Sequence, residues 1–218
     1  MNHPLENYQQ QLKIYQDEEK KRIKQMALIS TFRLLVFLSI GFGIYLLFNY
    51  RQFAVLVTVL GVALFIFLLS KHTTIKTERN FYKALVDINK EEININSGNF
   101  HHRKDGLEFQ NANHFYSIDI DLFGRGSFFQ YINRTTINEG THKLAAALKA
   151  NDIDDIKMRQ EAIKELNLKP QWRQYYAATS SLVVVETSAK SVIDWLKNHK
   201  PFMSKPIKWL PISFSVLS

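Results

Sequence analysis

The sequence predicts a mainly α-helical protein: a transmembrane helical hairpin with a helical stalk, followed by a small α-helical domain that contains one short extended segment. Three observations predict this class. Two uncharged apolar runs are separated by only four residues, amphipathic segments flank them, and capping residues recur through the C-terminal half. Apolar runs of this length are typical of membrane spans, and capped segments with helical periodicity are typical of short soluble helices.

The apolar runs cover residues 34–48 and 53–70, and neither carries a charged side chain. Both are apolar on every side, whereas an amphipathic helix of a soluble protein keeps a polar face. With its flanks, each run forms a helix of roughly 25–28 Å, close to the thickness of a bilayer core. The alternative is a buried hairpin in a large soluble core, which we disfavour because the remaining chain is small and polar.

Basic residues surround the hairpin unevenly and predict its orientation. Only Arg51 lies in the turn, whereas eight cations flank the outer ends of the runs: Lys20, Lys21, Arg22, Lys24, Arg33, Lys71, Lys76 and Arg79. The positive-inside rule therefore predicts a multi-pass protein of the cytoplasmic (inner) membrane with both termini in the cytoplasm.

Small residues recur along one face of each apolar run, namely Ser39 and Gly43 on the first and Ala54, Thr58 and Gly61 on the second. Such residues let two helices approach closely in lipid. Because neither run carries an ionisable side chain in its interior, we expect this face to serve packing and not an ion path.

The composition limits the classes of protein that the chain can belong to. It has 218 residues, a net charge of +8 and no cysteine, which excludes a disulfide framework and a cysteine-ligated zinc site. The first thirty residues are polar, so we expect no cleavable signal peptide and an uncleaved first span. The positive charge suits anionic partners, either lipid headgroups or nucleic acid.

Residues 2–27 and 71–94 have helical periodicity and leave the hairpin on the same side. We expect them to pair as an antiparallel stalk; the alternative for residues 2–27 is a surface helix that binds anionic lipid. The predicted organisation has five parts. They are an N-terminal cytoplasmic helix (1–33), the hairpin (34–70), a stalk helix with a loop (71–113), a helical domain (114–200), and an interfacial tail or truncated third span (201–218).

Residues 96–113 contain two turn signals and lie close to three histidines, His101, His102 and His114. A metal site needs further ligands in fixed geometry, and neighbouring histidines point apart in regular structure. We therefore expect ordinary polar loop histidines and no metal.

Residues 116–122 alternate between apolar and polar side chains, which predicts an extended segment with one buried face. Asp119 and Asp121 would then project from the other face, about 7 Å apart. We expect a solvated or salt-bridged pair; a divalent-cation or acid–base pair is the alternative.

Short capped helices follow. Ser127, Asn138 and Asp152 are suitable N-caps, and Pro170 suits a first helical turn. The expected helices cover 128–134, 139–150, a segment after Asp152, 171–185 and 188–198. The segment after Asp152 is predicted to bury one apolar stripe, made of Ile153, Ile156, Ile163 and Leu166.

A set of residues within 119–173 carries a resemblance to a known family: Gly126, Ser127, Asn133, Arg134, Thr135, Gly140, Leu144, Arg159 and Gln160. Their pattern resembles the opening of the helical core (lever) domain of MutS-type DNA mismatch repair ATPases, in a membrane-anchored branch. The resemblance implies that these residues are structural, with a contact to the DNA backbone as the alternative for Arg134.

The chain departs from the family in two respects. It contains no G-x-x-x-x-G-K-[ST] loop and no Phe-x-Glu mismatch-reading motif. We therefore expect no catalysis and no cofactor in this chain; ATP and Mg²⁺ belong to an ATPase domain that the sequence lacks.

Two functions follow as expectations. The first is a membrane-anchored MutS-like core fragment, a scaffold for a missing ATPase and DNA-clamp part, with a dimer or an in-trans partner at the helical domain. The alternative is a membrane adaptor that binds a cytoplasmic protein through exposed aromatic residues, Trp172, Tyr175, Tyr176 and Trp195. The competing and favoured expectation for these four residues is that they form the domain's own core. Any DNA binding would be salt-dependent and would use basic residues such as Lys143, Lys149, Lys157, Arg159 and Lys164.

Overall fold

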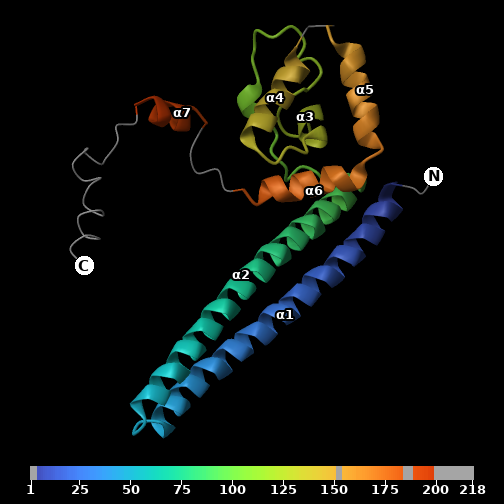
Figure 1. The fold of residues 1–218 in the computed structure, drawn as a ribbon. Coiled ribbons are helices and arrows are strands. Elements are labelled where there is room, and N and C mark those ends of the chain that lie inside the picture. The colour runs from blue at the N-terminus through green and yellow to red at the C-terminus, as the bar shows by residue number, and fades with distance from the viewer. Residues whose placement is uncertain (1–3, 151–153, 184–188, 199–218) are drawn as a thin grey trace. The chain divides into compact units, whose positions relative to one another are not determined.

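The structure, a computed structural model, describes residues 4–150, 154–183 and 189–198 (Figure 1). The chain divides into two compact units, residues 1–182 and residues 183–218. The first unit contains α1 (Pro4–Leu46), α2 (Arg51–Asn96), the 3-10 helix η1 (Leu107–Phe109), α3 (Phe128–Ile132), α4 (Asn138–Lys149), α5 (Ile156–Asn167) and α6 (Pro170–Ser181). The second contains α7 (Ala189–Asn198). The described ranges contain no β-strand.

Helices α1 and α2 are each continuous from the apolar hairpin into the predicted stalk and run antiparallel (Figure 1). Ion pairs join them outside the apolar runs, from Arg22 to Glu78 at 3.1 Å and from Arg79 to Glu19 at 3.7 Å. Tyr15 is buried in a cluster with α2 residues further along the stalk. The antiparallel stalk predicted from residues 2–27 and 71–94 is thereby confirmed for the described residues; residues 4–33 of α1 and 71–96 of α2 are called the stalk.

Both long helices contain a segment that is long and apolar enough to cross a membrane, with mean hydropathies of 2.0 and 2.8. None of the residues in these segments is buried within the structure. At the contact between the helices, a Cβ on Gly61 would lie 2.4 Å from the Ile40 side chain, and one on Gly43 would lie 3.0 Å from Val57. These two glycines therefore permit the close approach that the small residues predicted.

The remainder of the first unit, residues 97–182, is called the head. Its core is a cluster of Leu122, Phe123, Phe129 and Ala145. Ser127 caps α3 as predicted, because its hydroxyl accepts a hydrogen bond from the Gln130 amide at 3.1 Å.

Gly106 brings the loop before η1 against this core. Its φ is +70°, and a Cβ there would lie 2.5 Å from the Phe129 ring. Both the left-handed backbone and the absent side chain are needed for the ring to pack at this point.

Helix α6 attaches the head to the stalk. Ala178 is buried with Tyr15, Leu85 and Val86. Nearby, the side-chain amides of Asn89 and Gln174 exchange two hydrogen bonds, at 3.0 and 3.1 Å, and both residues are buried. The apolar contact fixes the two helices together, and the amide pair allows a single register between them.

The prediction of an extended segment over 116–122 is wrong, because these residues form consecutive turns. The amides of Ile120 and Leu122 donate to the carbonyls of Tyr116 and Ser117, at 3.2 and 2.9 Å. The carbonyl of Leu122 in turn accepts from the amide of Phe129. The chain reverses direction here and buries Leu122. The alternating pattern therefore corresponds to a series of turns packed against α3 and not to a strand. Asp119 and Asp121 are both exposed.

The buried stripe expected after Asp152 is also wrong. Helix α5 begins only at Ile156 and has no buried residue; Ile156, Ile163 and Leu166 are 40%, 67% and 38% exposed. The helical period produces an apolar face, but the described part of the chain buries none of its residues and covers them only in part. Asp152, Ile153 and the predicted tail at 201–218 lie outside the described residues.

Candidate binding groove

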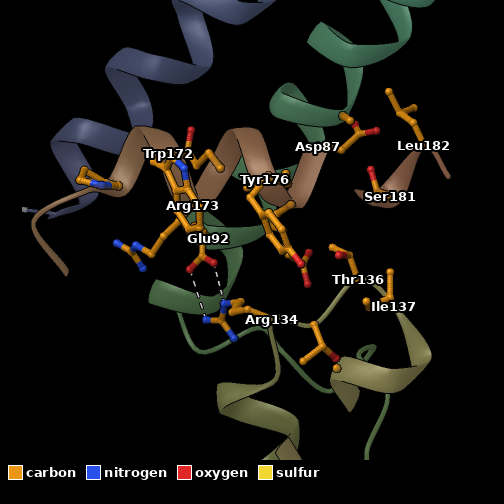
Figure 2. Close-up of a pocket in the computed structure, with 18 of the residues that line it drawn as sticks. Asp87, Glu92, Arg134, Thr136, Ile137, Trp172, Arg173, Tyr176, Ser181 and Leu182 are labelled. Carbon is orange, nitrogen blue, oxygen red and sulfur yellow. Dashed lines mark hydrogen bonds and ion pairs between the residues drawn. The ribbon is translucent and has the colours of Figure 1, made fainter. Parts of the chain in front are cut away.

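A groove of about 1140 Å³ lies where the stalk meets the head. It is lined by α2 between Arg79 and Glu92, by the chain from Ile132 to Leu144, and by α6. Figure 2 shows α6 on one side and the segment that leads into α4 on the other. Tyr8 of α1, Arg103 of the loop before η1, Leu166 of α5 and Leu182 after α6 complete the lining.

Two aromatic side chains of α6 form the exposed apolar part of the groove. The rings of Trp172 and Tyr176 are stacked, with centroids 5.5 Å apart and planes 15° apart. They are 55% and 57% exposed, although both line the groove. Stacking at helical spacing holds the two rings in place and leaves their outer faces open.

The other two predicted aromatics lie elsewhere. Tyr175 contacts Phe81 of α2, with ring centroids 5.4 Å apart, and Trp195 belongs to α7 in the second unit. None of the four aromatics is buried. The expectation that they form the core of the helical domain is therefore wrong, because phenylalanines before and within α3 supply that core.

One ion pair crosses the groove between the head and the stalk. The Arg134 Nε and Nη2 atoms donate to the two carboxylate oxygens of Glu92, at 2.6 and 3.2 Å (Figure 2). Arg134 Nη1 also donates to the carbonyl of Tyr131 at 2.5 Å. This forked geometry orients the guanidinium and fixes the chain between α3 and α4 against α2.

A second carboxylate, Glu91, accepts hydrogen bonds from two loop residues of the head. Arg103 Nη1 lies 2.6 Å and His102 Nε2 lies 2.9 Å from it. Burial raises the pKa of the Glu91 carboxyl, but the hydrogen bonds from Arg103 and then His102 outweigh it and leave the pKa below its ordinary value.

The stability of the head is therefore expected to depend on Glu91 in acid. Since its pKa is lower in the folded than in the unfolded state, its contribution is present above the unfolded pKa and is lost as the pH falls through the folded pKa. Glu91→Gln should flatten the fall in unfolding free energy that begins as the pH drops below the ordinary glutamate pKa of about 4.3, measured by denaturant titration. The exposed Glu108→Gln is the control and should leave that slope unchanged.

The groove as a whole is positively charged, with five basic and three acidic side chains in its lining. Glu91 and Glu92 are held by arginines, so Lys83, Asp87 and Arg173 remain as lining charges for which the described residues provide no ion pair. Arg173 lies near the Tyr8 hydroxyl, whose pKa is raised by burial and by Glu92 while Arg173 and Arg134 act against that rise.

The structure brings most of the residues of the family resemblance together around the connection from α3 to α4. Asn133 Oδ1 accepts from the Thr135 amide and hydroxyl, at 3.0 and 2.6 Å, and the Thr135 and Thr141 hydroxyls are 2.7 Å apart. Arg134, Thr135 and Gly140 line the groove, whereas Gly126 and Ser127 lie in the turn before α3. Arg159 and Gln160 lie apart, exposed on α5.

The histidines of the loop region serve local contacts. His114 Nε2 lies 2.9 Å from the Lys149 carbonyl oxygen, and the His101 ring packs on Phe100 with centroids 4.7 Å apart. His102 belongs to the Glu91 cluster.

Sequence reasoning missed several lining residues, above all Glu92, Lys83 and Arg173. The only signals were adjacent glutamates near the end of the predicted stalk and an arginine next to Trp172. No family model, curated protein or solved structure matches the chain.

Proposed function

We propose that the chain is a membrane-anchored, non-catalytic adaptor. The hairpin of α1 and α2 spans the cytoplasmic membrane with both termini in the cytoplasm, and the stalk carries a head whose groove binds a cytoplasmic protein. The observation that carries this proposal is the groove itself: two stacked, exposed aromatic rings in a preformed, positively charged recess.

Membrane insertion is supported by the absence of burial in the two apolar segments. A soluble protein buries helices that are apolar all round, but here no residue of either segment is buried. In a bilayer the same apolar side chains would contact lipid instead of water, and the flanking cations would remain in the cytoplasm.

Protein binding is supported by the type of residue in the groove. Trp, Tyr and Arg are the residues that most often dominate the energy of a protein interface, and all three types line this groove. The volume of about 1140 Å³ lies slightly above the usual range for small-molecule pockets, about 300–1,000 Å³. Because the buried amide pair holds α6 on the stalk, Trp172 and Tyr176 would be presented with little loss of conformational entropy on binding.

The test uses the full chain in lipid nanodiscs as bait for cytoplasmic protein. We expect one stoichiometric partner, and the double change Trp172→Ala and Tyr176→Ala should weaken its binding more than about tenfold, since such anchors are typically worth 2 kcal/mol or more. The control is Phe115→Ala, an aromatic side chain that is 85% exposed but lies outside the groove.

Two results would contradict the binding role. One is recovery of no stoichiometric partner from a lysate in which the bait is intact. The other is an equal loss of binding in Phe115→Ala and in the double variant, which would indicate non-specific adhesion to exposed aromatic side chains.

A second candidate is the MutS-like core fragment, with a DNA clamp completed by another chain. It is supported by the clustering of Asn133, Arg134, Thr135 and Gly140 into one connected segment. Duplex DNA titrated at 50 and 200 mM salt should then bind with an affinity that falls steeply with salt. An affinity independent of salt, or no binding at all, would contradict this candidate.

A further inference from the structure

Arg33 occupies an unusual position between the stalk and the apolar segments. It is the last charged residue of α1 before the apolar run, and its Cζ atom lies 5.1 Å from the centroid of the Phe65 ring on α2. Lys71, the first charged residue of α2 after the run, follows Phe65 by six residues. At 1.5 Å per residue, the Arg33 guanidinium therefore lies beside a residue of α2 that is about 9 Å nearer the hairpin turn than Lys71.

The hairpin offers this guanidinium no counter-ion. The sequence contains no aspartate or glutamate between Glu19 and Glu78. Both of these glutamates pair with other arginines in the stalk. Within the described part of the chain, Arg33 forms no ion pair, and its Nε atom is buried without a hydrogen-bond partner. A cation at the edge of an apolar band is costly unless a group outside the protein neutralises it.

A shallow cleft of about 390 Å³ opens beside Arg33. Its lining combines two polar groups, the Ser30 hydroxyl and the Arg33 guanidinium, with three apolar side chains, Leu34, Phe37 and Phe65. The apolar side chains lie within the apolar runs, whereas Ser30 lies one turn towards the stalk. The cleft thus combines hydrogen-bond donors for an anion with an apolar wall.

We propose that this cleft binds the phosphate group of an anionic phospholipid of the inner leaflet. The guanidinium donates to two phosphate oxygens, Ser30 donates to a third, and an acyl chain lies against Leu34 and Phe37. Guanidinium groups match phosphate oxygens in this forked way better than ammonium groups do. The apolar wall favours a lipid over a soluble phosphate, because only a lipid places an acyl chain beside its phosphate.

This inference rests on the proposed membrane insertion of the hairpin. It adds a specific site to the general attraction between basic residues and the inner leaflet, because Arg33 lies deeper than the other flanking cations and, unlike Arg22 and Arg79, forms no ion pair with a carboxylate among the described residues.

The experiment reconstitutes the full chain in phosphatidylcholine vesicles and measures the preference for spin-labelled phosphatidylglycerol over spin-labelled phosphatidylcholine by electron paramagnetic resonance. Arg33→Gln should lower that preference about fivefold, the effect of one cation at an anionic surface. Arg33→Lys should retain part of it, because the charge remains but the fork is lost. The matched control is Lys71→Gln, which removes a charge at the same end of the hairpin but outside the cleft.

Three results would overturn the site. Arg33→Gln could keep the wild-type preference, Lys71→Gln could lose as much as Arg33→Gln, or 10 mM glycerol phosphate could abolish the preference when sodium chloride of equal ionic strength does not. The last result would assign the cleft to a soluble phosphate. Co-flotation with the vesicles separates the two proposals: a wild-type chain that does not float contradicts membrane insertion itself, whereas a chain that floats without the Arg33-dependent preference contradicts the lipid site alone.

Discussion

Replacing Phe129 with alanine is expected to destabilise the head by about 3–5 kcal/mol, the usual cost of removing a buried phenylalanine. The side chain is fully buried and contacts two further rings, with centroids 5.4 Å from Phe123 and 5.7 Å from Phe109. Gly106 packs directly against its ring. The cavity would therefore be bounded by rigid rings and by backbone, which can collapse only in part.

The adjacent residue provides a matched control. Phe128 lies in the same helix and is 51% exposed, so Phe128→Ala should cost less than about 1 kcal/mol. Hydrogen exchange of peptides that cover α3 and α4, measured in the full chain, reports the opening free energy of this region. Equal loss of protection in both variants would contradict the assignment of Phe129 to the core.

Replacing either member of the amide pair between stalk and head is expected to cost about 1–3 kcal/mol, because the remaining amide stays buried and loses both hydrogen bonds of the pair. The pair comprises Asn89 and Gln174, and Asn89 Nδ2 also donates to the Leu85 carbonyl at 2.8 Å. Asn89→Leu and Gln174→Leu should each loosen α6 from α2. The double variant should be less destabilised than the sum of the two, since two apolar side chains can pack where two amides paired.

The measurement is a double-mutant cycle on the exchange protection of α6. Asn94→Leu, an exposed asparagine on the same helix, is the control and should have an effect within about 0.5 kcal/mol of zero. Strict additivity of Asn89→Leu and Gln174→Leu would contradict a direct interaction between the two amides.

The features of the fold that the sequence predicts correctly are those with a strong local signal. The apolar runs at 34–48 and 53–70 need no tertiary information, and the periodic segments beside them can pair only antiparallel once a tight turn joins the runs. Local capping chemistry also identifies Ser127 as the N-cap of α3 and Pro170 as the first residue of α6.

The failures occur where tertiary contacts decide. Leu122 is buried as an alternating pattern requires, but Ile118 and Ile120 are exposed because the chain folds back onto α3 and no neighbouring strand exists in the described residues. The sequence names Trp172 and Tyr176 as interface candidates, but the groove around them could not be predicted. It depends on the contacts of Glu92 with Arg134 and of Asn89 with Gln174, pairs separated by 42 and 85 positions in the chain, and a single sequence carries no signal for such pairs.

The most direct test of membrane anchoring uses the absence of cysteine from the sequence, because a single substitution then supplies the only thiol. Gln52→Cys places it at the start of α2, directly after the hairpin turn, and Lys13→Cys places it in the stalk; both positions are exposed. A maleimide reagent that cannot cross membranes should label Gln52→Cys in intact cells and Lys13→Cys only after the cells are opened. Equal labelling of the two variants in intact cells, or recovery of the folded chain in the aqueous fraction without detergent, would contradict a hairpin that spans the membrane.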